Sequence, residues 1–291
     1  MSRFWNERLL WALLTENKMT GQSDGHIPFP YGLYVEKMPK RGKKKLHWFP
    51  PLSGDFKTYL VYKYEPGVKS FLCFLKNRGK RSVTREVKIT SEIAVSIAEC
   101  HQKKPKQMRR GRLNRAYDTF LNQVLEFSAG FILPSDPFDL DALRQSEKVF
   151  SMLVCITKRW LHRGDRFRML HGDFQWKNVL LGRKNAIKLI DWSRFPWGDP
   201  GFDIGWWIGE YVYAHFQTGE KRYRDNALLF LRTYENVTRD TEIHEALLMG
   251  LLSKALVKVR FNNSDTGLPP RKLRSFLRFT EATYKRDTFI W

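Results

Sequence analysis

The sequence is poor in features that would assign it to several large classes of protein. Only three of its 291 residues are cysteines, and Cys73, Cys100 and Cys155 lie far apart without a C-x-x-C pair. This spacing suits free thiols in a reducing compartment better than a disulfide framework or a zinc site. No apolar run approaches the roughly 20 residues of a membrane-spanning helix. The N-terminal segment also lacks the apolar core of a signal peptide. We therefore expect a soluble, cytoplasmic protein.

Acidic residues are also scarce relative to basic ones. The chain has 51 Lys and Arg against 30 Asp and Glu, a formal charge of +21. Such a charge attracts anionic partners, among them nucleotides, phosphorylated substrates, nucleic acid and acidic membranes. Three basic stretches that contain glycine or proline are expected to be exposed loops: Lys37–Lys45, Lys76–Arg85 and Lys103–Arg115. They support at most a weak association with anionic surfaces. Nucleic acid is an unfavoured partner, because no nucleic-acid motif is present.

The N-terminal part is predicted to contain strands. The chain has 42% hydrophobic and 28% charged residues, as ordinary globular proteins do, and its length suits one large domain or two modest ones. An amphipathic helix is expected first, then three strands, and then a turn at Glu65-Pro66-Gly67. The helix spans Ser2–Asn17, and the strands span Tyr31–Val35, Leu46–Phe49 and Thr58–Tyr64.

Helical periodicity dominates after the turn. Helices are expected at Val68–Lys76, Ser91–Gln102, Tyr117–Phe127 and Asp139–Leu161, from Asp199-Pro200 onward, and over most of Tyr223–Tyr284. A short strand at Phe167–Leu170 and a hairpin of Val179–Leu181 with Ile187–Ile190 interrupt them. The prediction is an α+β fold with a small strand-containing part, residues 1–66, and a large helical part, residues 67–291, in which the hairpin is embedded.

Three polar side chains stand at fixed offsets around the hairpin in LHGDFQWKNVLL and KLIDWSRFPWGDPGFDIG. Asp173 follows the short strand, Asn178 enters the hairpin, and Asp191 leaves it. Phosphoryl transfer needs a carboxylate that orients the attacking hydroxyl, and Mg²⁺ prefers oxygen ligands such as amides and carboxylates. Each residue alone suits a turn former or helix cap just as well. Their occurrence together, in order, favours the phosphotransferase interpretation.

This block resembles the catalytic and metal-binding motif of the aminoglycoside phosphotransferase and choline kinase-like family, which has a protein-kinase-like fold. The resemblance implies that Asp173 is the catalytic base and that Asn178 and Asp191 bind Mg²⁺ beside ATP or GTP. It implies that His171 belongs to the catalytic loop, although a satisfied core histidine is an equally good interpretation. Asp203 becomes a buried anchor that hydrogen-bonds to that loop, with a simple helix N-cap as the alternative.

The resemblance extends upstream and then weakens. TYLVYKYEPG is similar to the family's hinge between lobes, which implies that Tyr62, Lys63 and Tyr64 lie beside the nucleotide base. An ordinary core strand is the alternative. Glu7 matches a structural glutamate that pairs with a strand lysine, yet neither that lysine nor a glycine-rich phosphate loop has a counterpart here. Truncation or gene decay is the favoured explanation. The alternatives are phosphate contacts from Lys37–Lys45 and a catalytically weak relative.

The expected function is ATP- and Mg²⁺-dependent phosphorylation of a hydroxyl group on a small molecule, such as a sugar, an amino alcohol or an antibiotic. The alternatives are an inactive nucleotide-binding or interaction module of the same fold, and a lipopolysaccharide or lipid head-group kinase. The charge of +21 makes a polycationic acceptor a poor match. Acidic residues that would form a local cleft for one are Asp139, Asp141, Glu210 and Glu220. A neutral or anionic acceptor fits the charge better.

Overall fold

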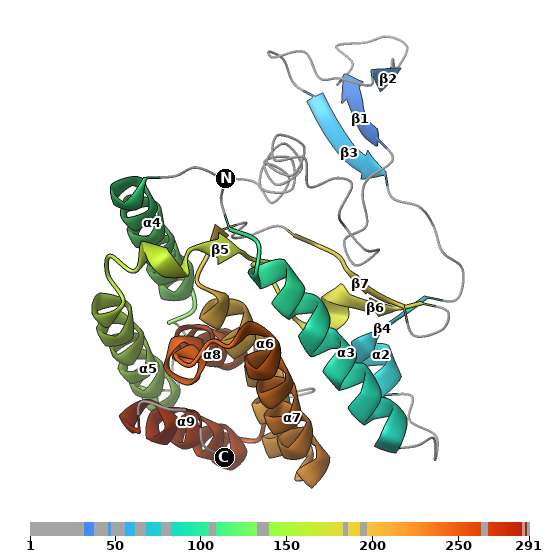
Figure 1. The fold of residues 1–291 in the computed structure, drawn as a ribbon. Coiled ribbons are helices and arrows are strands. Elements are labelled where there is room, and N and C mark those ends of the chain that lie inside the picture. Colours follow the sequence, from blue (N-terminus) through green and yellow to red (C-terminus); the bar gives the residue numbers. More distant parts are fainter. Residues whose placement is uncertain are drawn as a thin grey trace.

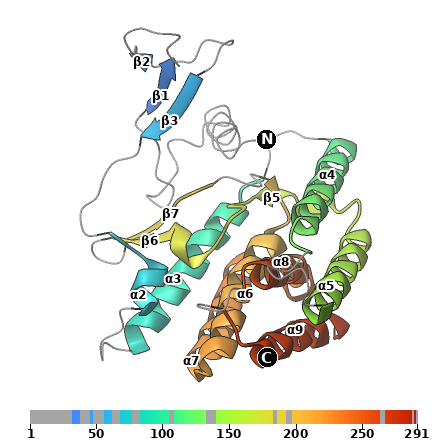
Figure 2. The same cartoon turned by 180° about the vertical axis from the view of Figure 1, so that it is seen from behind.

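The protein is described here from a computed structural model (Figures 1 and 2). The structure describes residues 32–37, 46–47, 56–61, 68–76, 83–104, 109–132, 140–182, 186–192, 197–262, 267–286 and 289. Several predictions fall outside these ranges: the first helix, Glu7, the hinge residues Tyr62, Lys63 and Tyr64, the turn that follows them, and Asp139.

An antiparallel sheet of three strands precedes the helices. Strand β1, Gly32–Lys37, lies between β2, Leu46–His47, and β3, Phe56–Val61. The register of β1 and β3 runs from Gly32 opposite Val61 to Lys37 opposite Phe56. The three predicted strands are therefore present; β3 covers Phe56–Val61, and the last predicted residues of that strand, Tyr62–Tyr64, lie outside the described ranges. In both views this sheet lies apart from the helices.

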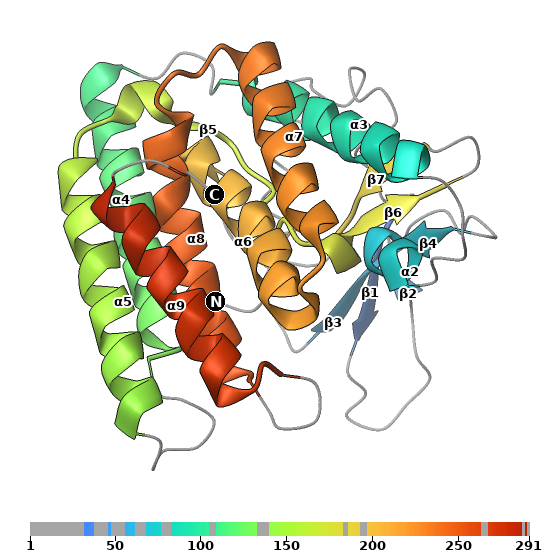
Figure 3. The ribbon, with the colours of Figure 1, turned by 90° about the horizontal axis from the view of Figure 1, so that it is seen from below.

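The helical part contains Asp173, Asn178 and Asp191; the segment His171–Asp173 is called the catalytic loop below, after its predicted role. Its helices are α2 (Phe71–Lys76), α3 (Val83–His101), α4 (Arg110–Ala129), α5 (Leu140–Arg159), α6 (Pro200–Thr218), α7 (Lys221–Thr238), α8 (Ile243–Arg260) and α9 (Pro270–Lys285). Helix α6 lies at the centre, between α7 and α8, and α3 packs on the outer side of α7 (Figure 3). The α+β, protein-kinase-like prediction of a small strand-containing part and a large helical part is confirmed.

Two glycines allow α6 and α8 to approach each other closely. A Cβ atom on Gly205 would overlap the carbonyl oxygen of Leu247, and one on Gly250 would overlap that of Phe202. The aromatic side chains of α6 pack around this contact. Trp207 stacks on Phe174, with ring centroids 4.5 Å apart, just beyond the catalytic loop. The central helix of the core is thus also the helix on which that loop rests.

The hairpin is present, and its neighbour differs from the prediction. Strand β6, Val179–Leu181, pairs with β7, Ile187–Leu189. The segment expected to be helical from Val68 begins instead with a short strand, β4, Lys69–Ser70, which pairs with β6. The helical periodicity of Phe71–Lys76 hid this strand, because its pairing partner lies more than 100 residues away in the chain.

The third basic stretch is helical in its second half, so the expectation of an exposed loop was wrong there. Arg110–Arg115 forms the first turns of α4, and its arginines are exposed. Arginine is a good helix former, but Leu113 is the only large apolar residue before Tyr117, so the apolar pattern becomes visible only later in the helix. The described parts of the other two stretches also join elements, at Lys37 in β1, at Lys76 in α2 and from Val83 to Arg85 in α3.

Two negative predictions can be compared with the described residues. Among them, no helix is both long and apolar enough to cross a membrane. Cys73, Cys100 and Cys155 are all free thiols, as predicted, and only Cys100 is buried.

Candidate active site

A short strand brings the chain to the catalytic loop. Strand β5, Arg168–Met169, pairs with β8, Trp197–Gly198, and leads directly into His171, Gly172 and Asp173. Gly172 has a φ of 79°, in the left-handed region, which glycine adopts without a steric penalty. The chain therefore turns sharply just before Asp173.

A buried carboxylate holds the backbone of this turn. Asp203 lies in the first turn of α6 and accepts hydrogen bonds from the backbone N–H groups of His171, at 2.6 Å, and Gly172, at 2.9 Å. Its side chain is fully buried. The N-cap of α6 is instead Asp199, whose side chain accepts from the N–H of Gly201 at 2.7 Å. Of the two interpretations left open for Asp203, this geometry fits the loop anchor.

The anchor is itself held by the last residue of α3. His101 Nε2 lies 3.1 Å from Asp203 Oδ2, and His101 Nδ1 lies 2.9 Å from the hydroxyl of Tyr234 in α7. All three side chains are buried. A buried polar group without a partner is costly, so this chain of bonds fixes the relative positions of α3, α6 and α7 behind the loop.

Asp173 and Asn178 are in direct contact. The Asn178 side-chain amide donates to the backbone oxygen of Asp173 at 2.9 Å and to its Oδ2 atom at 3.1 Å. Gln175 Nε2 donates to the same Oδ2 at 2.8 Å. Asp173 and Asn178 are each 3% exposed. Because the amide NH₂ group of Asn178 faces Asp173, its Oδ1 atom is directed away from that carboxylate.

The hairpin brings Asp191 to the same place. The N–H of Ile190 donates to the carbonyl oxygen of Asn178 at 2.9 Å, which joins the entry of the hairpin to its exit. Asp191 follows immediately with a φ of 68°. This left-handed conformation is uncommon outside glycine, although Asp tolerates it better than most residues. Strained backbone of this kind is frequent at functional sites.

His171 is a neutral core residue of the loop. Its side chain is 1% exposed, and its ring centroid lies 4.6 Å from that of Trp192. Its Nδ1 atom accepts from the N–H of Asp173 at 3.3 Å, so the neutral ring carries its proton on Nε2. Burial lowers the pKa of His171, outweighing the opposite effects of Asp203 and Asp173. A neutral, enclosed imidazole can support the loop.

The donor atoms around Asn178 and Asp191 fit a magnesium ion. Amide and carboxylate oxygens are the hard ligands that Mg²⁺ takes from proteins, usually one or two at a time beside phosphate oxygens and water. Within the described ranges, no group of three or more His, Cys, Asp or Glu side chains forms a metal site.

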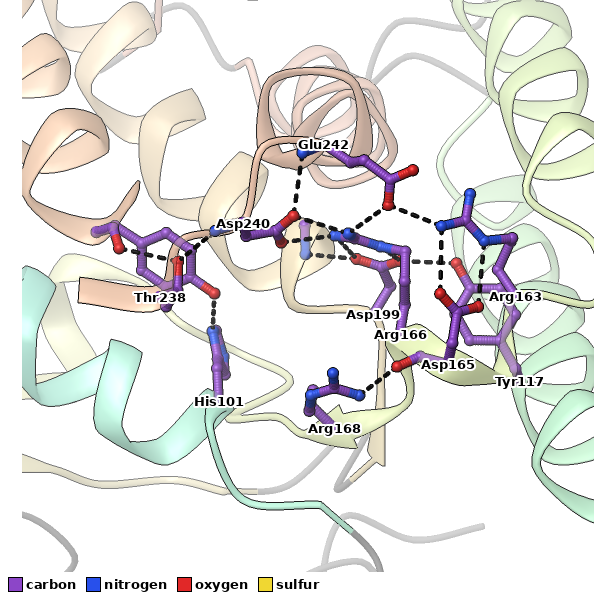
Figure 4. Close-up of polar contacts among 12 residues, drawn as sticks. His101, Tyr117, Arg163, Asp165, Arg166, Arg168, Asp199, Thr238, Asp240 and Glu242 are labelled. Carbon is purple, nitrogen blue, oxygen red and sulfur yellow. Dashed lines mark hydrogen bonds and ion pairs between the residues drawn. The ribbon is translucent and has the colours of Figure 1, made fainter. Parts of the chain in front are cut away.

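A charged network secures the elements on both sides of the loop (Figure 4). Arg166 is 7% exposed and precedes β5. It donates to both oxygens of Asp199, at 2.7 and 3.1 Å, and to both oxygens of Asp240, at 2.9 Å each. Tyr117 of α4 also donates to Asp199, at 2.7 Å. The network ties the start of β5 to the N-terminus of α6 and to the turn after α7. Charge-assisted bonds of this kind are stronger than neutral ones.

Sequence analysis missed most of these supporting residues. The one sequence signal for His101 is that Ser91–Gln102 resembles a helix of the family that ends in Leu-His. Nothing in the local pattern distinguished Arg166 from the other basic residues. A buried cluster of Glu210 with two lysines of α8 was also missed. Lys254 and Lys258 lie 2.5 and 2.8 Å from the Glu210 carboxylate.

This cluster changes the interpretation of Glu210. Although burial opposes its ionisation, Lys254 and Lys258 lower the pKa of Glu210 to about 2. Burial in turn lowers the pKa of Lys254 to about 8, against the effect of Glu210. Glu220 forms an ion pair with Arg222 at 2.6 Å. Neither glutamate is an unpaired acid available to a polycationic substrate.

Most of the aromatic residues near the motif belong to the core. Those with buried side chains are Trp192, Trp206, Trp207, Tyr211 and Tyr213, whereas Trp197 is partly buried. No role in stacking on a ligand is needed to explain them.

The fold has clear relatives among solved structures, all of them distant in sequence. A glucosamine kinase in complex with glucosamine, ADP and inorganic phosphate matches with a TM-score of 0.57 and 10% identity, over 94% of this chain and 72% of its own. Another crystal form of glucosamine kinase gives 0.55 and 11%, over 96% of this chain and 66% of its own. A microcompartment-associated aminopropanol kinase gives 0.54 and 12%, over 98% of this chain and 80% of its own.

These structures define the fold as that of small-molecule kinases. The chain spans about two thirds of the length of the glucosamine kinases. A family model described as the phosphotransferase enzyme family matches residues 82–237, more than half of the chain. The protein therefore belongs to this phosphotransferase enzyme family, and the predicted resemblance is confirmed. No curated protein matches the sequence.

Proposed function

We propose that the protein transfers the terminal phosphate of ATP or GTP to a hydroxyl group of a small molecule. The observation that carries the proposal is the contact between Asp173 and Asn178, with Asp191 joined to them through the hairpin. In this proposal the Asp173 carboxylate orients the acceptor hydroxyl and accepts its proton. The two amide donors on Oδ2 hold that carboxylate in one position, so little reorganisation is needed when the acceptor arrives.

Asn178 and Asp191 would hold the magnesium ion, with Tyr62, Lys63 and Tyr64 beside the nucleotide base. When bound, the ion would neutralise charge on the transferring phosphate. In the same proposal, residues 1–66 form the lobe with the hinge that contacts the nucleotide base, and residues 67–291 form the lobe with the catalytic and metal-binding residues. The proposal is supported by family membership and by kinases of the same fold, one of which was solved with ADP.

The acceptor is proposed to be neutral or anionic, such as a sugar. Two of the acidic residues considered for a cationic acceptor, Glu210 and Glu220, already bind lysine or arginine. In the Glu210 cluster, two ammonium groups face one carboxylate, which leaves an excess of positive charge between α6 and α8. A polycationic antibiotic is unfavourable beside such a cluster.

The proposal is tested by phosphate transfer from Mg·ATP and Mg·GTP to a panel of hydroxyl compounds that includes amino sugars, neutral sugars, amino alcohols and sugar acids. Asp173→Asn should lower kcat by roughly 10²–10⁴-fold, the usual contribution of a general base. Nucleotide binding should be retained. The matched control is Asp225→Asn on the exposed side of α7, which should leave kcat unchanged.

Magnesium dependence separates the metal ligands from the base. Asn178→Ala and Asp191→Asn should each raise the Mg²⁺ concentration needed for half-maximal transfer, whereas Asp173→Asn should not. If wild-type protein binds nucleotide but transfers phosphate to no acceptor and to no water molecule, the protein is a non-catalytic nucleotide-binding module and the proposal fails.

A further inference from the structure

A polar cavity lies on the other side of the elements that hold the catalytic loop. It has a volume of about 430 Å³. Its walls are the end of α3, the segment that leads into β5, and the turn between α7 and α8. The described lining residues are His101, Gln102, Lys104, Asp165, Arg166, Arg168, Pro200, Tyr234, Thr238, Arg239, Asp240, Thr241 and Glu242. None of them belongs to the Asp173, Asn178 and Asp191 cluster.

The acidic wall of this cavity already has its counterions. Arg163 binds both oxygens of Asp165, at 3.1 and 3.3 Å, and Glu242 at 2.7 Å. Arg166 binds both oxygens of Asp240 and also contacts Glu242 at 3.2 Å. Figure 4 shows these carboxylates directed at the two guanidinium groups. Each of these carboxylates is therefore paired with an arginine within the protein.

The basic wall has no such compensation. Arg168 donates through Nη1 to the carbonyl oxygens of Asp165, at 2.5 Å, and Phe167, at 3.1 Å. Within the part of the chain that the structure describes, neither Arg168 nor Lys104 nor Arg239 contacts a carboxylate. Burial and the neighbouring Arg166 lower the pKa of Arg168, outweighing the opposite effects of Asp199, Asp240 and Asp165. An arginine in this situation is stabilised by an added anion.

The charges around the cavity are close to balanced once the Asp203 carboxylate behind His101 is included, so an anion is favoured locally, at the cations without an ion pair. The network behind the acidic wall has two arginines, Arg163 and Arg166, and four carboxylates, which include the buried Asp199. This network therefore carries a charge of −2, and Arg168, Lys104 and Arg239 together carry +3. In Figure 4 the Arg168 side chain lies apart from the carboxylates of Asp240 and Glu242, which are directed at Arg166 and Arg163.

We propose that this cavity binds the phosphate group of a small molecule, with Arg168 as the main ligand and Lys104 and Arg239 at the entrance. A phosphate dianion matches several converging cations, and arginine binds it with directed N–H donors. The source is either free phosphate or a phosphorylated metabolite, because the same group would be recognised in both.

A ligand in this cavity touches the residues that position the catalytic loop. His101 and Tyr234 form part of the wall and connect through Asp203 to the backbone of His171 and Gly172. The N–H of Met169, next to Arg168, donates to the carbonyl oxygen of Lys103 at 3.2 Å. Binding should therefore reduce the opening of the loop, which amide hydrogen exchange measures independently of any enzymatic activity.

The test uses isothermal titration of the full chain with inorganic phosphate and, separately, glycerol 3-phosphate, at constant ionic strength. We expect saturable binding of at least one of them. Arg168→Gln should weaken it roughly 10- to 100-fold, the usual effect of losing a charge-assisted hydrogen bond. Tighter binding of the ester identifies a phosphorylated metabolite as the ligand, and similar binding identifies free phosphate; both support the site.

The matched control is Arg112→Gln, which removes one exposed arginine from the basic start of α4. It should leave the affinity within twofold. If Arg168→Gln does not fold, the exposed pair Lys104→Gln and Arg239→Gln replaces it, with the same expected loss. Phosphate should also slow amide exchange in residues 168–173 of the wild type.

Three results would overturn the proposal. The first is no saturable binding of either ligand. The second is equal weakening by Arg112→Gln and Arg168→Gln, which means general attraction to a basic surface. The third is binding that Mg·ADP displaces and that Arg168→Gln leaves intact, which places the anion at the catalytic motif. Failure of this site leaves the proposed phosphotransfer untouched, because its lining residues and its assay are separate.

Discussion

Replacing Asp203 by asparagine is the sharpest test of how the catalytic loop is held. The substitution preserves shape but removes the charge and exchanges one acceptor oxygen for an NH₂ group. If the NH₂ group takes the position of Oδ2, it faces the N–H of His171; in the other orientation it faces that of Gly172. In either orientation one buried backbone donor loses its acceptor, and the remaining bonds lose their charge assistance.

The expected loss of stability follows from these contacts. A hydrogen bond to a charged group contributes about 1.5–3 kcal/mol, and a buried donor left without a partner costs about 1–3 kcal/mol. Because His101 can adjust its tautomer and keep a bond to residue 203, we expect a net destabilisation of about 3 kcal/mol. With an m-value of about 3 kcal/mol/M in urea for a chain of this size, this corresponds to a fall of the unfolding midpoint by roughly 1 M.

The assay is urea unfolding followed by tryptophan fluorescence, with amide exchange of residues 170–175 as a local measurement. Asp225→Asn is the matched control, since Asp225 is exposed, and it should change stability by less than about 0.5 kcal/mol. If Asp203→Asn lowers the free energy of unfolding by less than about 1 kcal/mol and leaves exchange in the loop unchanged, Asp203 does not anchor it and the reasoning is wrong.

Two further predictions concern α6. Gly205→Ala should lower the free energy of unfolding by about 2–3 kcal/mol, since its Cβ would overlap backbone of α8; Gly111→Ala in α4, where the added Cβ meets no atom within 4 Å, should be neutral or stabilising. The pKa of Glu210 falls on folding from 4.5 to about 2, so its contribution is present above pH 4.5 and is lost toward pH 2. Between pH 4.5 and pH 2, the Glu210 ion pairs should therefore account for a loss of up to about 3 kcal/mol in the free energy of unfolding of the wild type. In Glu210→Gln this part of the loss should be absent. If the free energy of unfolding falls equally with pH in the two proteins, Glu210 is not stabilised by its two lysines.

The predicted and observed structures agree where the pattern is local. The periodicity of α5 and the hairpin of β6 and β7 were found within a residue or two of their bounds. The strand β4 and the first turns of α4 were missed for different reasons. Strand β4 is defined by its pairing with β6, which no local pattern reveals, and the early turns of α4 bury few apolar side chains, which leaves the helical period weak.

The linear order of Asp173, Asn178 and Asp191 was sufficient to identify the family, because the offsets around a short hairpin leave few ways to arrange these side chains. For Asp203, the resemblance implied an anchor near them, with a helix N-cap as the alternative. Only the tertiary structure decided what surrounds them: the pairing of His101 with Asp203, the network of Arg166, and the two lysines around Glu210. These contacts join residues from helices far apart in sequence, and a charged residue looks the same in a sequence whether it is solvated or buried with a partner.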